Sequence, residues 1–359
     1  MRRNTPALVA FGIFATVFGD AAAASPPVCD RAGVNIFDAS HLPAGWENLP
    51  FAWYKDFSAL SPPLVRGEGR ARLEYVPILT WQAGRDNFVI RALASAAFLK
   101  GDVPHPESMG LADFRDLISL ERLEQRIRRD VSRWPHGSLF LVGIEPGYRP
   151  NGDARSPEAI VRDAAVLRKT LDAMDRGYRL GLGGISTPRN AFTHDAYGGI
   201  YGLEFLDRIL ELPRSFEFDA FVIHPYPSDP VAPSAEDSAE QIRAMRRLLA
   251  RHGLRDRELI VGEVGTPFRG VDVAEATAYA GEIVEFMLTA EDPETGNPRD
   301  GNRLVQRFSW MLLSPLHRPM PGFSDNPSLD FEISALVDLG GTLTPVGQAF
   351  LAALGRCRN

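Results

Sequence analysis

Two glutamates that each follow a short apolar run are the residues of this sequence best suited to acid–base chemistry. Residues 139–144 lead into Glu145, and residues 259–262 lead into Glu263. In glycoside hydrolysis one carboxyl group protonates the departing oxygen, while a second carboxylate attacks the anomeric carbon or activates water. The acid must keep its proton near neutral pH, which burial favours, and the second group must stay ionised, which nearby hydrogen-bond donors favour.

The two glutamates come from distant segments, so they can meet only in a fold that gathers strand ends at one rim. Short apolar runs alternate with helical patterns along the chain, which indicates parallel strands covered by helices. We expect strands at residues 51–54, 75–81, 139–144, 178–185, 220–224, 259–263 and 308–313. We expect helices at residues 156–176, 203–212, 239–252, 273–288 and 345–354, with Ser156 as the N-cap of the first.

Seven strands leave an eight-stranded barrel one strand short. We place the missing strand between Trp81 and Trp134, where residues 87–99 fit a strand or a buried helix equally well. No glycine-rich phosphate loop follows the first strand, which disfavours the alternative of an open doubly wound sheet. Close backbone packing explains the glycine-rich stretch 181–184. The expected fold is therefore α/β, a (β/α)8 TIM barrel that forms a single domain.

The N-terminal residues have the pattern of a secretory signal peptide. Two arginines precede an apolar stretch at residues 7–18, and small residues follow at 21–25. The apolar stretch is shorter than the roughly 20 residues that a membrane span needs. We expect residues 1–24 to be removed, leaving residues 25–359 without a membrane span and exported to the periplasm or the extracellular space.

Both cysteines, Cys29 and Cys357, lie in this expected mature part. In an oxidising compartment such a pair favours a disulfide over two free thiols. A closed barrel would make its first and last elements neighbours, so a bridge between them is geometrically reasonable. Neither cysteine has a clustered partner for metal binding.

The overall composition excludes several classes of function. Hydrophobic residues make up 45% of the chain and charged residues 24%, enough for a large core. The formal net charge is -7 and there is no basic stripe, so nucleic acid is a poor candidate partner. Neither a Gly-x-Ser-x-Gly elbow nor a His-Glu-x-x-His motif is present, which disfavours other hydrolase classes. We expect a monomer that needs no metal or organic cofactor.

Four motifs, in order along the chain, resemble the retaining glycoside hydrolases of a large barrel clan, clan GH-A. Members of that clan carry the acid/base after strand four and the nucleophile after strand seven. The motifs are Glu145-Pro146, His224-Pro225-Tyr226, Glu263-Val264-Gly265 and Phe308-Ser309-Trp310. The segment 341–350 also resembles the closing segment of many clan members, and the order agrees over residues 51–354.

The resemblance implies a role for each motif. Glu145 would be the acid/base and Glu263 the nucleophile. His224 and Tyr226 would lie near the Glu263 carboxylate and keep it ionised. Trp310 would form the floor of the sugar subsite by stacking on the CH-rich face of a pyranose.

Four further residues are candidates for contacts with the substrate. Trp53, Trp81 and Tyr148 follow other expected strands and would either stack on sugars in neighbouring subsites or pack in the core. The clan usually has an asparagine directly before the acid/base, where it binds the sugar 2-hydroxyl, but this chain has Ile144. Gln82 could supply a substitute amide.

Several of these residues could instead have purely structural roles. Glu145 could be a rim carboxylate that pairs with Arg149 or Arg179, and His224 and Trp310 could simply fill the core. The sequence nonetheless predicts an exported retaining glycosidase, endo-acting on a β-linked polysaccharide or oligosaccharide. The alternative is a weak or inactive barrel that binds glycan in polysaccharide export or surface assembly, and Ile144 is the residue that favours it.

Overall fold

The computed structural model describes eight stretches of the chain. They are residues 29–37, 42–56, 73–76, 78–79, 128–129, 134–148, 155–316 and 328–357. The expected signal peptide and the candidate substrate contacts Trp81 and Gln82 lie outside the described residues. No helix within the described part is both long and apolar enough to cross a membrane.

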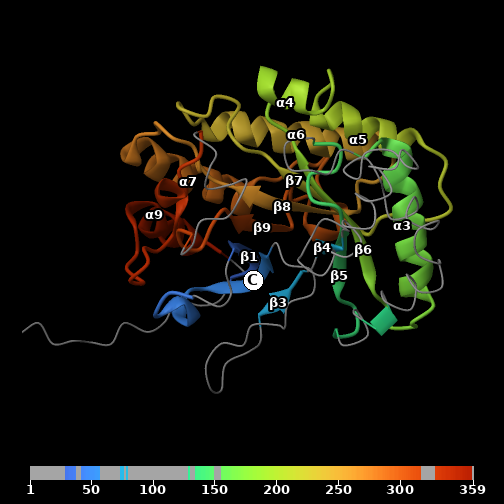
Figure 1. Ribbon diagram of the computed structural model, residues 1–359, viewed down its shortest axis with the longest axis horizontal. Coiled ribbons are helices and arrows are strands. Elements are labelled where there is room, and N and C mark those ends of the chain that lie inside the picture. Colours follow the sequence, from blue (N-terminus) through green and yellow to red (C-terminus); the bar gives the residue numbers. More distant parts are fainter. Residues whose placement is uncertain are drawn as a thin grey trace, which may run out of the picture.

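The described strands form one sheet in which every pairing is parallel (Figure 1). They are β1 (Cys29–Ile36), β2 (Phe51–Asp56), β3 (Glu74–Tyr75), β4 (Ile78–Leu79), β5 (Leu139–Val142), β6 (Arg179–Ser186), β7 (Ala220–His224), β8 (Glu258–Val264) and β9 (Arg307–Trp310). Their order in space is β3-β2-β1-β9-β8-β7-β6-β5-β4.

The two outermost strands of that order, β3 and β4, are adjacent in sequence. Tyr75 ends β3 and Ile78 begins β4, so together they occupy one barrel position and bring the two edges of the sheet together. With β3 and β4 counted as one, the sheet has the eight parallel strands of a barrel. The expected (β/α)8 fold is therefore confirmed.

The strand that completes the barrel is β1 and not one between Trp81 and Trp134; residues 87–99, the candidate segment there, lie outside the described residues. The apolar side chains of β1 alternate with a glycine and a buried asparagine, Gly33 and Asn35. This alternation leaves no continuous apolar run, which is the signal that identified the other strands. The first two expected strands consequently occupy the second and third barrel positions.

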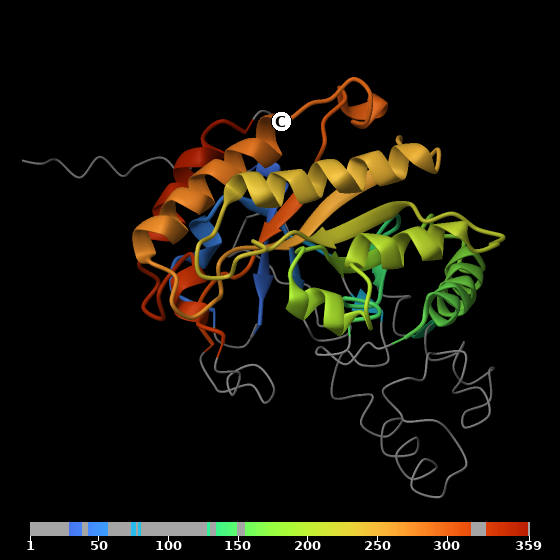
Figure 2. The same ribbon diagram turned by 90° about the horizontal axis from the view of Figure 1, so that it is seen from above.

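Helices cover the outside of the curled sheet (Figures 1 and 2). They are α3 (Pro157–Asp172), α4 (Ala191–Ala196), α5 (Gly202–Glu211), α6 (Ala235–Arg251), α7 (Val273–Thr289), α8 (Phe331–Ser334) and α9 (Pro345–Leu354). Short 3-10 helices lie at η1 (Trp46–Asn48) and η6 (Pro298–Asp300). The N-cap predicted at Ser156 is confirmed, because its side chain accepts from the backbone N–H of Ala159. The short helix α4 was not expected.

Side chains of each strand alternate between two apolar layers, as the period of a strand requires. The inward layer fills the barrel and consists of Trp53, Val76, Ile78, Leu139, Leu141, Ala220, Val222 and Ile260. The outward layer, which includes Phe308 and Phe350, packs between sheet and helices. The same alternation decides which side chains reach the mouth of the barrel above the inward layer.

The predicted disulfide is confirmed. Cys29 at the start of β1 is bonded to Cys357, which follows α9, and the two Cα atoms lie 5.9 Å apart. The bridge spans 328 positions of sequence and joins the first and last described elements of the barrel. Closure of the barrel is what makes these two elements neighbours, as the sequence suggested.

Candidate active site

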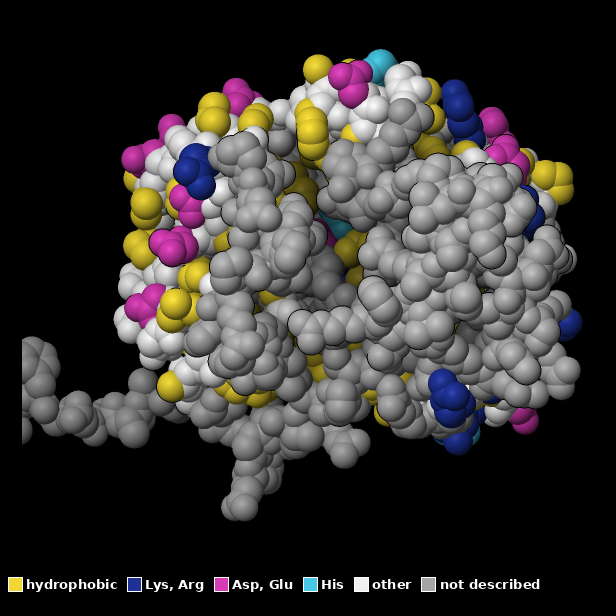
Figure 3. All heavy atoms as spheres, in the orientation of Figure 1, with side chains coloured by type: hydrophobic (Ala, Val, Ile, Leu, Met, Phe, Trp, Pro, Cys, Tyr) yellow, Lys and Arg dark blue, Asp and Glu magenta, His cyan; other side chains and the backbone are white. Residues whose placement is uncertain are grey.

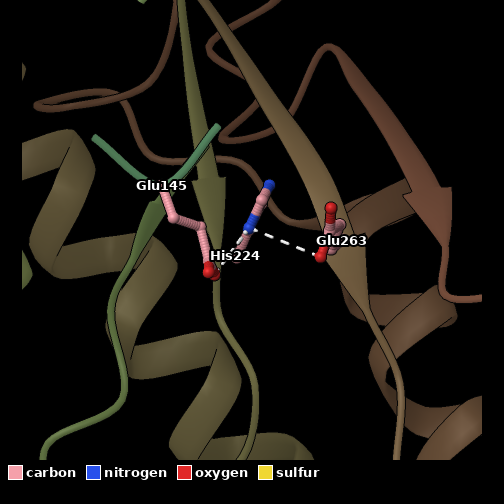
Figure 4. Close-up of side chains that lie close together, drawn as sticks. All are labelled: Glu145, His224 and Glu263. Atoms are coloured by element: carbon pink, nitrogen blue, oxygen red, sulfur yellow. Dashed lines mark hydrogen bonds and ion pairs between the residues drawn. The ribbon is translucent and has the colours of Figure 1, made fainter. Parts of the chain in front are cut away.

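Glu145 and Glu263 meet at the ends of β5 and β8, on either side of His224 at the end of β7 (Figure 4). One carboxylate oxygen of each glutamate and one ring nitrogen of His224 lie within 4.8 Å of one another. Both glutamates are nearly buried, with 4% and 5% of their surface exposed. Figure 3 shows an opening in this face of the molecule, with acidic and histidine side chains visible at its base.

The His224 ring bridges the two carboxylates. Its Nδ1 lies 3.0 Å from Oε1 of Glu145 and 3.5 Å from Oε2 of Glu263. The sequence had associated His224 with Glu263, but the shorter contact is with Glu145. A single imidazole nitrogen is therefore within reach of both candidate catalytic groups.

Glycines on the two strands that flank β7 create the slot for this ring. A Cβ atom at Gly184 of β6 would lie 1.8 Å from Nε2 of His224, and one at Gly262 of β8 would lie 3.1 Å from the same atom. At Gly183 a Cβ would lie 1.8 Å from a backbone carbonyl oxygen of the neighbouring strand segment. Close packing is thus the reason for the glycine-rich stretch, as expected.

Hydrogen-bond donors surround the Glu263 carboxylate. Lys55 Nζ lies 2.5 Å from Oε1, and the Tyr226 hydroxyl donates to Oε2 over 2.9 Å. Burial acts to raise the pKa of Glu263, but the charges of His224 and Lys55 and these hydrogen bonds outweigh it and lower the pKa. Burial, followed by the nearby negative charge of Glu263, raises the pKa of Tyr226 well above its ordinary value. Glu263 is therefore held ionised and Tyr226 protonated.

Sequence reasoning missed Lys55, although a signal was present. Residues 51–54 end the expected strand, and Lys55 continues it two positions after the inward-facing Trp53. Because every second side chain of a strand points to the same face, Lys55 points toward the barrel axis, as Trp53 does. A buried ammonium group there needs a carboxylate partner. Lys55 is 1% exposed, and Glu263 is that partner.

Glu145 is placed by an unusual backbone conformation. Its φ is 45°, in the left-handed region that non-glycine residues rarely adopt, at a cost of about 1–2 kcal/mol. The neighbouring Gly143 and Gly147 also have positive φ, and the backbone N–H of Tyr148 donates to the Glu145 carbonyl to close the turn. Such conformations cluster at functional sites, where the surrounding structure holds them. Burial, and then the charge of Glu145, raises the pKa of the Tyr148 hydroxyl.

A second polar group missed from the sequence supports the strand that carries Glu263. Asn35 of β1 donates through Nδ2 to the Gly262 carbonyl at 3.0 Å, the Ser309 hydroxyl at 3.2 Å and the Trp310 carbonyl at 3.2 Å. Ser309 donates to the same Gly262 carbonyl over 2.5 Å. Because Gly262 directly precedes Glu263, these bonds fix the backbone from which the carboxylate projects.

The structure does not place the two described tryptophans in a sugar subsite. Trp310 shares the outward side of β9 with Phe308, where its indole N–H donates to the Ser334 carbonyl and its ring packs against Phe350. Trp53 does face inward, but it lies within the apolar layer below Lys55. Both rings are essentially unexposed, which leaves no face for a sugar, so these two assignments are corrected to core packing.

The arginine proposed as a structural partner of Glu145 lies elsewhere. Arg179 begins β6 and forms an ion pair with Glu258 at the start of β8, the opposite end of the barrel from Glu145. Arg149 lies outside the described residues. The candidate substrate contact Tyr148 does lie beside Glu145, and Ile144 packs against the top of the inward layer.

Among the described residues, only Glu145, His224 and Glu263 form a group with the donor set of a divalent-cation site. The Lys55 ammonium already pairs with Glu263 and would repel a cation at this point. The arrangement therefore fits acid–base and nucleophilic chemistry better than metal binding. It provides one buried carboxylate held ionised and a second one close by.

Comparison with known proteins supports the fold. No model of a known protein family and no curated protein sequence matches the chain. Among solved structures it is similar to a family 128 (subgroup I) endo-β-1,3-glucanase of Amycolatopsis mediterranei in complex with laminaripentaose, with 18% identity, a TM-score of 0.50 and coverage of 90% of this chain and 99% of that one. It is also similar to a family 128 (subgroup IV) endo-β-1,3-glucanase of Lentinula edodes, with 14% identity, a TM-score of 0.52 and coverage of 89% and 98%.

A third similar structure is the endo-β-1,4-mannanase of Thermotoga petrophila, with 11% identity, a TM-score of 0.52 and coverage of 91% of this chain and 77% of that one. At such low identity the likeness establishes the barrel fold. The resemblance to the barrel clan of glycoside hydrolases therefore holds at the level of the fold.

Proposed function

We propose that this barrel is a retaining glycoside hydrolase that cleaves a β-linked polysaccharide or oligosaccharide. The observation that carries the proposal is the approach of Glu145 and Glu263 to within 4.8 Å at the mouth of the barrel. Retaining enzymes hold their two carboxyl groups about 5–5.5 Å apart, whereas inverting enzymes leave roughly 6.5–9.5 Å for a water molecule. The short distance between carboxylate oxygens of Glu145 and Glu263 is compatible with direct attack by the Glu263 carboxylate on the anomeric carbon.

In the first step, an oxygen of Glu263 attacks the anomeric carbon while the glycosidic bond breaks. The electron pair of that bond goes to the departing oxygen, which takes a proton from the Glu145 carboxylic acid. Glu263 becomes a neutral ester and Glu145 becomes a carboxylate. The negative charge of the site thus moves from β8 to β5.

In the second step, the Glu145 carboxylate removes a proton from water, whose oxygen attacks the anomeric carbon. The ester bond breaks and returns its electron pair to Glu263. His224 suits this exchange because its Nδ1 lies within 3.5 Å of both glutamates and can donate to whichever one is ionised. Lys55 and Tyr226 stabilise the Glu263 carboxylate at the start and end of the cycle.

The substrate and setting are part of the same proposal. Endo action on a β-linked glycan is favoured because similar barrels include endo-β-1,3-glucanases and an endo-β-1,4-mannanase. The disulfide between Cys29 and Cys357 supports an oxidising compartment and hence export to the periplasm or beyond. The chain would act as a monomer, and the two-glutamate mechanism needs no metal or organic cofactor.

Ile144 favours a second candidate, a barrel that binds glycan without cleaving it efficiently. Its side chain packs on the inward apolar layer and cannot hydrogen-bond a sugar hydroxyl. Bonds to the 2-hydroxyl contribute several kcal/mol to the transition state in glycosidases. Their loss at this position would lower the rate while leaving affinity for sugar.

A panel of β-1,3-glucan, β-1,4-glucan, mannan and xylan separates the two candidates. The wild type should release reducing ends from at least one polymer, and the Glu263→Gln variant should bind that polymer without cleaving it. Glu240→Gln, on the exposed side of α6, is the matched control and should cleave as the wild type does. Binding without cleavage by the wild type would favour the sugar-binding barrel.

The anomeric form of the first product tests the stereochemistry. Retention is expected, because carboxylate oxygens of Glu145 and Glu263 approach within 4.8 Å, closer than the spacing of the carboxyl groups in inverting enzymes. Inversion, observed by NMR immediately after addition of enzyme, would contradict nucleophilic attack by Glu263.

A further inference from the structure

We propose that Phe192, supported by the buried ring of Tyr148, forms an aromatic platform that binds a sugar on the leaving-group side of the cleaved bond. This inference rests on the proposed glycosidase function and adds a binding site to it. Its ligand class is a β-linked chain of pyranoses whose hydroxyl groups are largely equatorial, so that each ring has an apolar face.

The order of the strands gives the direction of the substrate. From Glu263 on β8 the sheet continues through β7 and β6 to β5, which leads into Glu145. The bond to be cleaved must lie between nucleophile and acid, so the leaving group continues past Glu145. Tyr148 lies three residues after Glu145, and its ring contacts Phe192 of α4, which places Phe192 beside the acid rather than beside Glu263.

Phe192 is an exposed aromatic ring in the place where the leaving group would lie. It is 62% exposed, and of the four large hydrophobic side chains exposed within the described ranges it is the only aromatic one. Its ring meets that of Tyr148 edge to face, with centroids 6.1 Å apart and planes at 75°. Figure 3 shows hydrophobic side chains at α4 on the same face of the molecule as the opening.

The segment that carries Phe192 is fastened to the neighbouring strand end. Asn190 caps α4 by accepting from the Thr193 N–H, and its Nδ2 donates to the Ser228 carbonyl at 3.0 Å. The backbone N–H of Arg189 donates to the Ser228 hydroxyl over 2.9 Å. Because α4 has only six residues, these bonds rather than helix length hold it in place.

The Tyr148 ring also packs against other aromatic side chains. Its ring packs against Tyr197 with centroids 5.5 Å apart, and the Tyr197 hydroxyl accepts from the Ser186 N–H at the end of β6. Tyr197 in turn packs against Phe205 of α5. The platform is thus ordered before any ligand arrives, which reduces the entropy lost on binding.

Aromatic rings combine a large apolar area with few rotatable bonds, so an exposed and braced ring binds the CH-rich face of a pyranose well. A face of about 60 Å² covered by sugar corresponds to roughly a tenfold gain in affinity. An exposed phenyl group without such a ligand would only add hydrophobic surface to the protein.

Binding measured without turnover tests the platform. In the Glu263→Gln background, calorimetry with β-1,3-glucan, β-1,4-glucan, mannan and xylan oligosaccharides of two to six units should show affinity rising with length. Adding Phe192→Ala should weaken the binding of the longer oligosaccharides about tenfold and change the binding of the shortest ones little. Adding Leu339→Ala, which truncates another exposed hydrophobic residue, should leave the affinities unchanged.

Kinetics of the active enzyme give a second measurement. Phe192→Ala should raise KM for the polymer more than for an aryl glycoside, since the latter lacks the sugar that the platform would hold. Equal affinities with and without Phe192→Ala, in a protein whose wild type cleaves the glycan, would overturn the platform alone. Absence of both cleavage and oligosaccharide binding would overturn the proposed function together with the platform.

Discussion

Replacement of Lys55 by methionine is the sharpest test of how the site keeps Glu263, the proposed nucleophile, ionised. The ammonium lies 2.5 Å from Glu263 Oε1, and the two side chains are only 2% and 7% exposed. Removing one partner of such a buried pair costs roughly 3–5 kcal/mol if the other stays charged. Glu263 can avoid most of that cost by taking up a proton, so its pKa should rise once the Lys55 charge is gone.

The sign of the pH dependence follows from the lowered pKa of Glu263 in the folded protein. The ion pair contributes stability above the ordinary pKa of a glutamate, and this contribution is lost as the pH falls through the lowered value. The free energy of unfolding should therefore differ most between wild type and Lys55→Met near neutral pH. The difference should shrink in acid.

The assay is a profile of kcat/KM against pH on the glycan that the wild type cleaves. The acidic limb of the Lys55→Met profile should move to higher pH, and the limb of Lys55→Arg, which keeps the charge, should stay close to that of the wild type. Urea unfolding at two pH values provides the stability measurement. An acidic limb that stays in place in a folded Lys55→Met protein would refute the assignment of Lys55.

Three further perturbations test other parts of the structure. Glu145→Gln should abolish cleavage of the natural glycan but still give a first-turnover burst of dinitrophenol from a dinitrophenyl glycoside, because that leaving group needs no proton whereas the second step lacks its base; absence of the burst would contradict the acid role. Gly184→Ala should displace the His224 ring, because its Cβ would lie 1.8 Å from Nε2, and should lower kcat at least tenfold; unchanged kinetics would contradict the ring's role. Replacing both Cys29 and Cys357 by serine should lower the free energy of unfolding by up to about 5 kcal/mol, as measured by urea denaturation under oxidising conditions. Equal stability of the variant and the wild type would show that the disulfide does not stabilise the fold.

The sequence revealed the barrel because its strands are continuous apolar runs separated by amphipathic helices. Residues 259–262 and 139–144 stand out for this reason, and they led directly to Glu263 and Glu145. The strand β1 escaped notice because its inward positions are Gly33, where a Cβ would clash with the Trp53 ring, and Asn35, which is polar. A strand with polar or small inward residues lacks the continuous apolar run by which the other strands were recognised.

The sequence predicted those site residues that belong to recognisable local motifs. Both glutamates, His224 and Tyr226 converge, but Lys55 comes from a distant strand and has no motif of its own. The error over Trp310 has the opposite origin, because a matching motif outweighed the alternation along its strand. Counting positions from Phe308, an outward apolar residue, would have turned Trp310 away from the cleft.

The bond between Cys29 and Cys357 makes the folded chain a covalent ring. A protease that cuts one exposed loop between these positions would release no fragment, because both pieces remain tethered through sulfur. Two cuts, or one cut and a reductant, would be needed to separate them. In the exported setting proposed above, such a ring would keep a nicked molecule in one covalent piece.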